Sequence, residues 1–261
     1  MINKKKKESI YNLSENSKKS NADFKSANQL ASAIYAVFKK LLDRSASRNQ
    51  YQRLNKLIIK ILHSDSKDFL GKRKLYQGNV TLLKGFRLNP YTRWDSLIHV
   101  QPLIIVSPVD KTLNIHLPVI EAKDVVVPPR ASKLVLQFAC CEVDADSISV
   151  NTHISAKLIL PLEQNIVLSK AKRMSMHLPE MEGKILLVTL IIRTYLYDNY
   201  GHDQHTPAEF LSNDRKYYAG EILEVFYVKD GYLVTYEENK TEKLRPLNDF
   251  IDREDVQWED E

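Results

Sequence analysis

The sequence predicts an α+β protein in which an N-terminal helical hairpin precedes an antiparallel β-sandwich and a small C-terminal β-meander. Up to about residue 63, apolar residues recur at the three- and four-residue spacing of amphipathic helices. From about residue 79 the apolar period shortens to two, and prolines divide the chain into many short strands. An Asp-Gly pair at 230–231, between two alternating apolar runs, is typical of a tight β-hairpin.

These patterns divide the chain into six segments. They are a disordered basic arm at 1–26, a helical hairpin at 27–70, an antiparallel immunoglobulin-like β-sandwich at 71–200, a loop at 201–215, a β-meander at 216–250 and an acidic tail at 251–261. The arm is assigned as disordered because it is rich in Lys, Ser and Asn and has no apolar period. The final meander is expected to pack against the sandwich or a partner, since three strands alone are marginally stable.

The helical hairpin is expected to consist of one helix from Asn28 to Asp43 and a second from a cap at Asn49 to His63. Each helix has one apolar stripe and an outer face rich in Lys and Arg. The stripes are Leu30, Ile34, Val37, Leu41 and Leu42, and then Tyr51, Leu54, Ile58, Ile61 and Leu62. Stripes of this width must pack against another element.

The sandwich is expected to be antiparallel because no helical pattern separates its candidate strands. The candidates are Val80–Leu83, Phe86–Leu88, Leu103–Val106, Leu113–Leu117, Asp124–Val127, Lys133–Cys140, Ser147–Ser155, Lys157–Leu160, Arg173–His177 and Lys184–Tyr197. The run from Leu186 to Ile192 is apolar on both faces, which indicates a central strand.

Composition narrows the class of protein. The 261 residues are 43% apolar and 27% charged, as in ordinary soluble proteins. The longest uncharged apolar run, 185–192, is far below the roughly 20 residues of a membrane helix, and no apolar region follows the lysines at 4–7 to form a secretory signal. The two cysteines are adjacent and support no disulfide framework. We therefore expect a cytoplasmic protein that does not contact membranes.

The net charge of +5 conceals a polarity along the chain. Residues 1–74 carry 18 Lys and Arg against 6 Asp and Glu, whereas residues 209–261 carry 7 against 15. Such asymmetry is typical of a basic surface for nucleic acid or an acidic interaction tail, and also of two solvated ends that attract each other.

The stretch at 71–94 contains Gly71, Gly78 and Gly85, which are seven residues apart. This spacing matches neither a phosphate-binding loop nor a dinucleotide fingerprint, because both need clustered glycines before a helix. The glycines are interpreted as a helix stop, a turn and a bulge or tight bend.

Basic and aromatic residues also interleave around this stretch, a pattern with which single-strand binders neutralise phosphates and stack bases. The candidate nucleic-acid residues are Arg44, Arg48, Arg53, Lys72, Arg73, Lys74, Lys84, Arg87 and Arg93. The alternative is that the cations face water and the aromatic residues lie in the core.

Two further groups could carry chemistry. His202 and His205, three apart in a polar segment, could bind a metal, although a zinc site needs three or four ligands. Cys140 and Cys141 could supply a nucleophile only beside a base and positive charge, and we expect one thiol to face the core. The sequence predicts no cofactor and no catalytic residue.

The segments "RSASRNQYQRLNKLI", "GKRKLYQGNVTLLKGFRLNPYTRWDSLI" and "NIHLPVIEAKDVVVPPRASKLVLQF" resemble a group of uncharacterised bacterial proteins over about residues 33–143. Those proteins join a short arginine-rich helical region to a β-sandwich-like half and have no assigned activity. Residues 217–247 are similar to small SH3-like barrels of the Tudor type. That resemblance implies an aromatic cage for a methylated cation, with Tyr217, Tyr218, Phe226, Tyr232 and Tyr236 as its candidates.

The sequence is most consistent with a non-enzymatic binding or scaffolding protein whose partners are other proteins. The first alternative is a nucleic-acid-associated protein that uses the basic N-terminal third. The second is a metal-dependent enzyme with a loop site at His202 and His205.

Overall fold

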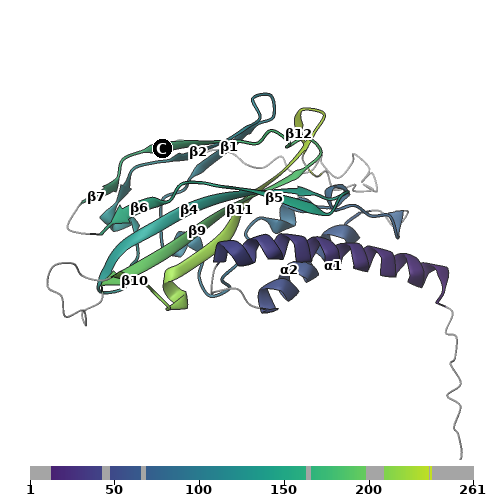
Figure 1. Cartoon of the computed structure of the whole chain (residues 1–261), viewed down its shortest axis with the longest axis horizontal. Helices are drawn as coiled ribbons and strands as arrows, with labels where there is room; N and C mark the ends of the chain where they lie inside the picture. Colours follow the sequence, from purple (N-terminus) through teal and green to yellow (C-terminus); the bar gives the residue numbers. More distant parts are fainter. Residues whose placement is uncertain are drawn as a thin grey trace, which may run out of the picture.

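The computed structural model describes residues 13–42, 48–65, 69–162, 166–197, 209–234 and 236. These residues form three layers, with a helical hairpin on one face of a central β-sheet and a smaller sheet on the other (Figure 1). All strand pairs among them are antiparallel. The predicted α+β class is therefore confirmed.

The helical layer consists of α1 (Glu15–Leu42) and α2 (Arg48–His63). The buried residues of their predicted stripes are Leu30, Ile34, Leu41, Leu42, Leu54, Ile58, Ile61 and Leu62. Side chains three and four residues apart lie on the same face of a helix, so each stripe packs on the other helix and on the central sheet. The predicted hairpin is confirmed. No helix among the described residues is long and apolar enough to span a membrane.

Helix α1 begins earlier than predicted, so the disordered arm assigned to residues 1–26 is wrong for residues 15–26. Within this part Asp23 is buried, and its carboxylate accepts the backbone N–H of Gly71 at 3.0 Å. The contact face here is polar or made of small residues, and it therefore shows no apolar period. Residues 1–12 of the arm lie outside the described part of the chain.

The segment between the helices and the sheets consists mainly of short 3₁₀ turns. They are η3 (Leu75–Gln77), η4 (Val80–Leu83) and η5 (Trp94–Ser96). The predicted strand at Val80–Leu83 is therefore wrong. The side chain of Asn79 caps η4 by accepting the N–H of Thr81 at 3.2 Å. Val80 and Leu83 are both buried, as residues three apart in a 3₁₀ turn can be.

Residues 85–88 run beside β11 (Tyr218–Lys229) without forming the predicted strand. Arg87 makes a single β-bridge with Glu221, and the N–H of Gly85 donates to the carbonyl of Ile222 at 2.8 Å. This segment therefore covers part of one edge of the central sheet. Gly71 is not a helix stop, because α2 already ends at residue 63, and it occupies a later turn with φ +87°.

The central sheet has seven strands. In spatial order they are β12 (Tyr232–Val234), β11, β9 (Ile185–Tyr197), β4 (Ala131–Asp144) and β5 (Ser149–Ile154), with β10 (Glu209–Leu211) beside β9 and β6 (Leu158–Pro161) beside β4. The central position of β9 confirms the prediction for the run from Leu186 to Ile192. Strand β10 lies within the segment predicted as a loop at 201–215, whose first eight residues are outside the described chain.

The outer sheet has three strands in the order β1 (Leu103–Ser107), β2 (Thr112–Leu117) and β8 (Lys172–His177). Next to it lie a two-stranded sheet of β3 (Ile120–Glu121) and β7 (Val167–Ser169), and the turns η6 (Ala122–Asp124) and η7 (Arg215–Tyr217). The predicted strand at Asp124–Val127 is wrong, since only Val125 makes a β-bridge there, to Ile98.

The central sheet separates two hydrophobic cores, because successive side chains of a strand point to opposite faces. On β9, Leu187 and Ile191 pack toward the helices, whereas Leu186 and Leu190 pack toward the outer sheet. Cys141 and Cys140 of β4 divide in the same way. Both thiols are therefore buried, where the sequence predicted one.

The hairpin predicted at Asp230-Gly231 is confirmed. It joins β11 to β12, and its two central residues have φ angles of +53° and +76°, as a type I′ turn requires. Strand β11 pairs with β9 over most of its length, so this segment extends the central sheet. The third strand of the predicted meander lies outside the described residues.

Candidate functional site

The structure places the predicted nucleic-acid residues in several different environments. Arg44 lies outside the described residues, Arg48, Lys72, Lys84 and Arg93 are exposed, Arg53, Lys74 and Arg87 are half-buried, and Arg73 is buried. Four of them form ion pairs: Arg73 with Asp23 at 3.7 Å, Lys74 with Asp146 at 2.8 Å, Lys84 with Glu224 at 2.5 Å and Arg93 with Asp95 at 2.5 Å. The described members therefore do not form one continuous cationic face, and nucleic-acid binding by this set stays a prediction.

Arg53 of α2 contacts the segment that runs beside β11. Its guanidinium lies 5.0 Å from the centre of the Phe86 ring and donates to the backbone carbonyl of Arg87 at 2.7 Å. Burial lowers the pKa of Arg53, and repulsion from Arg87 lowers it further. Arg53 thus links α2 to the segment along β11.

The five aromatic residues proposed for a cage lie apart. Tyr218 packs in the core beneath the helices, whereas Tyr217 and Phe226 pack against the core beneath the outer sheet. Tyr232 is 75% exposed on the terminal hairpin. The Tyr236 hydroxyl donates to a backbone carbonyl just after α2, at 2.9 Å. The structure does not bring these residues together around one cavity.

The predicted metal ligands His202 and His205 lie outside the described residues, and the loop site stays a prediction. Within the ranges that the structure describes, no group of three or more His, Cys, Asp and Glu side chains is placed to hold a metal ion. Elemental analysis of the purified full chain tests the prediction directly, because a metal site requires a stoichiometric metal.

Both cysteines are expected to be unreactive in the folded protein. Burial raises the pKa of Cys141 to about 12, and burial together with Cys141 and Glu142 raises the pKa of Cys140 well above its usual value. The thiolate is the reactive form, so almost none is present at pH 8. We expect Ellman's reagent to label neither thiol at pH 8 until urea unfolds the chain. Rapid labelling of the folded protein would contradict this.

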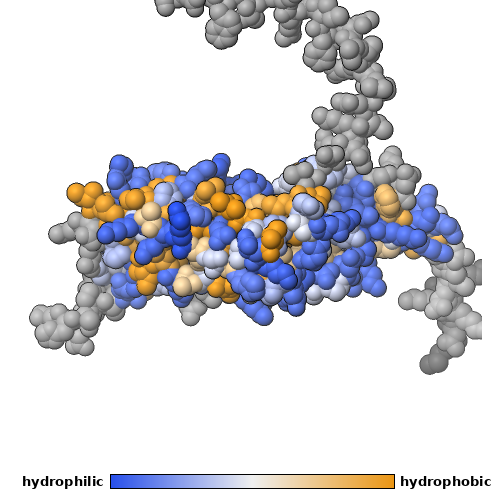
Figure 2. All heavy atoms as spheres, turned by 90° about the horizontal axis from the view of Figure 1, so that it is seen from above, coloured by the Kyte–Doolittle hydropathy of each residue, from blue (hydrophilic) through white to orange (hydrophobic). Residues whose placement is uncertain are grey.

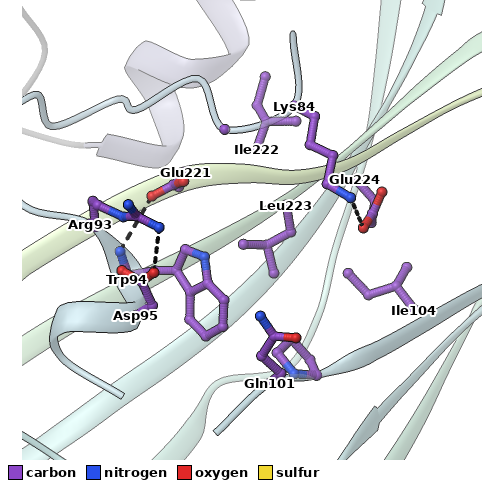
Figure 3. A pocket seen from close by; sticks show the side chains of 12 residues that line it. Lys84, Arg93, Trp94, Asp95, Gln101, Ile104, Glu221, Ile222, Leu223 and Glu224 are labelled. Carbon is purple, nitrogen blue, oxygen red and sulfur yellow. Dashed lines mark hydrogen bonds and ion pairs between the residues drawn. The ribbon is translucent and has the colours of Figure 1, made fainter. Parts of the chain in front are cut away.

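A cavity of about 320 Å³ opens between β11 and the start of β1, and we take it as the candidate functional site (Figure 3). Its volume is in the range of small-ligand sites. Its lining residues are Lys84, Gly85, Arg93, Trp94, Asp95, Gln101, Pro102, Ile104, Glu221, Ile222, Leu223 and Glu224. Four separate stretches of the chain meet here, and both β-sheets contribute to the walls.

A β-bulge in β11 sets the chemistry of this cavity. The register between β11 and β9 shifts between Ile222 and Glu224, so Leu223 is an extra residue. In a regular strand, residues three apart point to opposite faces. The bulge inserts one position and places Glu221 and Glu224 on the same side, where both line the cavity.

Two of the carboxylates in the cavity are neutralised by neighbouring cations. Glu224 pairs with Lys84, and Asp95 pairs with Arg93, in both cases at 2.5 Å (Figure 3). Both pairs are partly exposed, so they contribute little to stability. These two pairs engage both cations that line the cavity. The third carboxylate, Glu221, has no cation at ion-pair distance within the described part of the chain.

Glu221 is therefore the unusual group of the cavity. It is only 7% exposed, and its Oε2 accepts one long hydrogen bond, from the backbone N–H of Trp94 at 3.4 Å. Burial raises the pKa of Glu221 and Asp95 adds to this, whereas the Trp94 N–H, Arg93 and Arg87 oppose it. A buried carboxylate with little compensation is typical of functional sites.

We expect Glu221→Gln to raise the melting temperature at pH 7.5. The pKa of Glu221 is higher in the folded than in the unfolded protein, so its protonated form stabilises the fold. This stabilisation is fully present below the unfolded-state pKa and is lost as the pH rises through the folded-state pKa. Glutamine mimics the protonated form at every pH. The stabilisation should therefore shrink toward pH 4 in differential scanning calorimetry. An equal or lower melting temperature for the variant at pH 7.5 would contradict the assignment.

The sequence predictions do not include this cavity. Its residues are distant in sequence, and alternation along β11 would place Glu221 and Glu224 on opposite faces. Arg93 and Trp94 do lie in the stretch at 71–94 that combines basic and aromatic residues, so part of the signal is present.

Comparison of the chain with protein-family models, with curated proteins and with solved structures gave no match. The resemblances to uncharacterised bacterial proteins and to Tudor-like barrels therefore stay expectations.

Proposed function

We propose that this protein binds other proteins, and that an extended segment of the partner adds as a fourth strand to the edge of β1. The observation that carries the proposal is the open and uncharged edge of that strand. Strand β1 is the first in the outer sheet, and no described strand pairs with its other side. Its side chains Leu103 and Ile105 are 58% and 44% exposed.

The composition of this edge differs from that of the opposite edge. Natural proteins commonly block exposed edges with charged residues or prolines. Strand β8, on the other edge of the same sheet, carries Lys172 and Arg173, whereas β1 carries no charged residue. Among the other edge strands, β6 ends in Pro161, which has no N–H to donate, and β12 has only three residues.

The surface around β1 is consistent with such contact. Figure 2 looks down on the side of the molecule where the outer sheet lies, and apolar side chains reach the surface there between polar ones. The exposed apolar residues of β1 and of the turn after it include Leu103, Ile105 and Val109. Strand addition uses backbone hydrogen bonds for affinity and such alternating side chains for specificity.

A selection of peptides followed by one substitution tests this proposal. Random twelve-residue peptides displayed on phage are selected on the full chain, and their affinities are measured by fluorescence anisotropy. We expect Ile105→Lys to weaken the selected peptides by at least about tenfold, because a charge on an edge strand opposes further pairing. Ile159→Lys is the matched control, since Ile159 is an exposed isoleucine, at 52%, on β6, an edge strand of the central sheet. Absence of binders, or equal loss in both variants, would contradict the proposal.

A second candidate function is contact of the helical layer with nucleic acid. The outer surfaces of α1 and α2 have eight exposed cations and one exposed anion, Glu15. The cations are Lys18, Lys19, Lys25, Lys39, Lys40, Arg48, Lys56 and Lys60. Several recur at spacings of seven or four residues, so they form stripes along one face of each helix.

This candidate is tested by the salt dependence of DNA binding. If phosphates are neutralised by these stripes, the affinity for single- or double-stranded DNA must fall steeply between 50 and 200 mM salt, by about tenfold or more. Lys56→Glu with Lys60→Glu should weaken binding further, whereas Lys170→Glu just before β8 together with Lys172→Glu at its start should not. Absence of binding at low salt removes this candidate.

A further inference from the structure

The candidate cavity lies at the start of the strand edge that we propose as the docking site. Ile104 belongs to β1 and also lines the cavity, as do Gln101 and Pro102 just before the strand. A strand added to β1 would run about 4.8 Å away, and the residue opposite Ile104 would point inward on the same face as Ile104. An inward side chain of the added segment is therefore next to the cavity.

The charges in the cavity favour a cationic occupant. Lys84 and Arg93 each neutralise one carboxylate, and Glu221 remains with a single backbone hydrogen bond of 3.4 Å. Its Oε1 has no hydrogen-bond partner in the described ranges of the chain, although the side chain is more than nine-tenths buried. An incoming ammonium or guanidinium group would supply the missing charge and donors.

The walls of the cavity match the rest of such a side chain. Pro102, Ile104 and Leu223 offer apolar surface for an aliphatic stem. The indole of Trp94 lies between Glu221 and Gln101 in Figure 3, and tryptophan is the best aromatic partner for a cation. Gln101 also lines the cavity, and its amide oxygen can accept a hydrogen bond.

We infer that the cavity receives a lysine or arginine side chain from the extended protein segment that adds to β1. The inference rests on the proposed function and specifies its partner. The occupant is a strand-forming segment in which one inward position is basic. Recognition combines a charge-assisted contact with Glu221 and burial of the stem beside Trp94.

Blocked eight-residue peptides test the inference. They alternate valine and threonine, and one inward position is lysine, norleucine or glutamate. The chain carries Trp258→Phe, so that Trp94 is its only tryptophan. We expect the lysine peptide to bind at least about tenfold more tightly than the norleucine peptide and to shift the Trp94 emission, with the glutamate peptide weakest. Equal affinities for lysine and norleucine would overturn the inference.

Substitution of the carboxylate identifies its role. Glu221→Gln keeps the side-chain shape and removes the charge, so it should abolish the preference for lysine and leave the affinity of the norleucine peptide unchanged. Glu180→Gln is the control, because Glu180 is an exposed carboxylate that pairs with Lys184 and does not line the cavity. A lysine preference that survives in Glu221→Gln would contradict the inference.

The experiment separates the two proposals. If all peptides bind equally and Ile105→Lys weakens them all, strand addition stands and selection of a basic side chain is wrong. If no peptide binds, or Ile105→Lys changes nothing, strand addition itself fails and the inference falls with it.

Discussion

Gly78→Ala is expected to lower the free energy of unfolding by about 3 kcal/mol. A Cβ atom at this position would lie 2.1 Å from the carbonyl oxygen of Ile61 and 2.8 Å from its carbonyl carbon. That carbonyl belongs to the last turn of α2 and accepts both the N–H and the hydroxyl of Ser64, at 3.0 and 2.6 Å. It cannot turn aside, so α2 or the chain at Gly78 must move. Urea unfolding followed by circular dichroism measures the loss.

Gly183→Ala serves as the control for this prediction. Gly183 has φ +71°, and no atom lies within 4 Å of the place that an alanine methyl group would take, so only backbone strain opposes alanine there. We expect a loss of about 1 kcal/mol. Equal losses in the two variants would mean that the close approach of Gly78 to α2 does not exist.

Asp23→Ala is expected to destabilise the fold by about 3 kcal/mol. The buried carboxylate lies 3.7 Å from the guanidinium of buried Arg73, and it accepts the backbone N–H groups of Gly71 and Arg73 at 3.0 and 3.4 Å. The substitution removes a charged partner of buried Arg73 and the acceptor of two backbone N–H groups, and the loss of one member of a buried ion pair is costly. The same urea titration measures the loss.

Two comparisons sharpen this expectation. Asp23→Asn keeps an acceptor for the backbone N–H groups and should lose less than the alanine variant. Asp146→Ala removes an exposed ion pair with Lys74 and should cost at most about 1 kcal/mol. If Asp23→Ala behaves like Asp146→Ala, the first turns of α1 do not pack as described.

The sequence predictions are correct where a segment is buried through apolar residues, and they fail where polar contacts or a local cap determine the structure. The buried residues of the helical stripes and of the run in β9 are apolar, so the sequence shows their spacing directly. The first part of α1 is held by a carboxylate, Asp23, and by small residues, and its pattern is therefore similar to that of a disordered arm. The turn at Val80–Leu83 contains strand-forming residues, but its local cap and tertiary packing override that propensity.

The candidate site was beyond prediction for a geometric reason. Whether Glu221 and Glu224 share a face depends on one extra residue in β11, and a bulge of this kind leaves no period in the sequence. The edge position of β1 depends likewise on the spatial order of strands in the outer sheet, which the order of strands along the chain does not specify.

Hydrogen exchange at β1 tests the central claim most directly. Amide exchange of the full chain is followed by mass spectrometry with and without a selected peptide. Strand addition should slow exchange in Leu103–Ser107 by at least about tenfold, because the open edge gains backbone hydrogen bonds, and should leave β6 unchanged. Binding of the peptide without protection of β1, or with protection at β6 instead, would contradict the account.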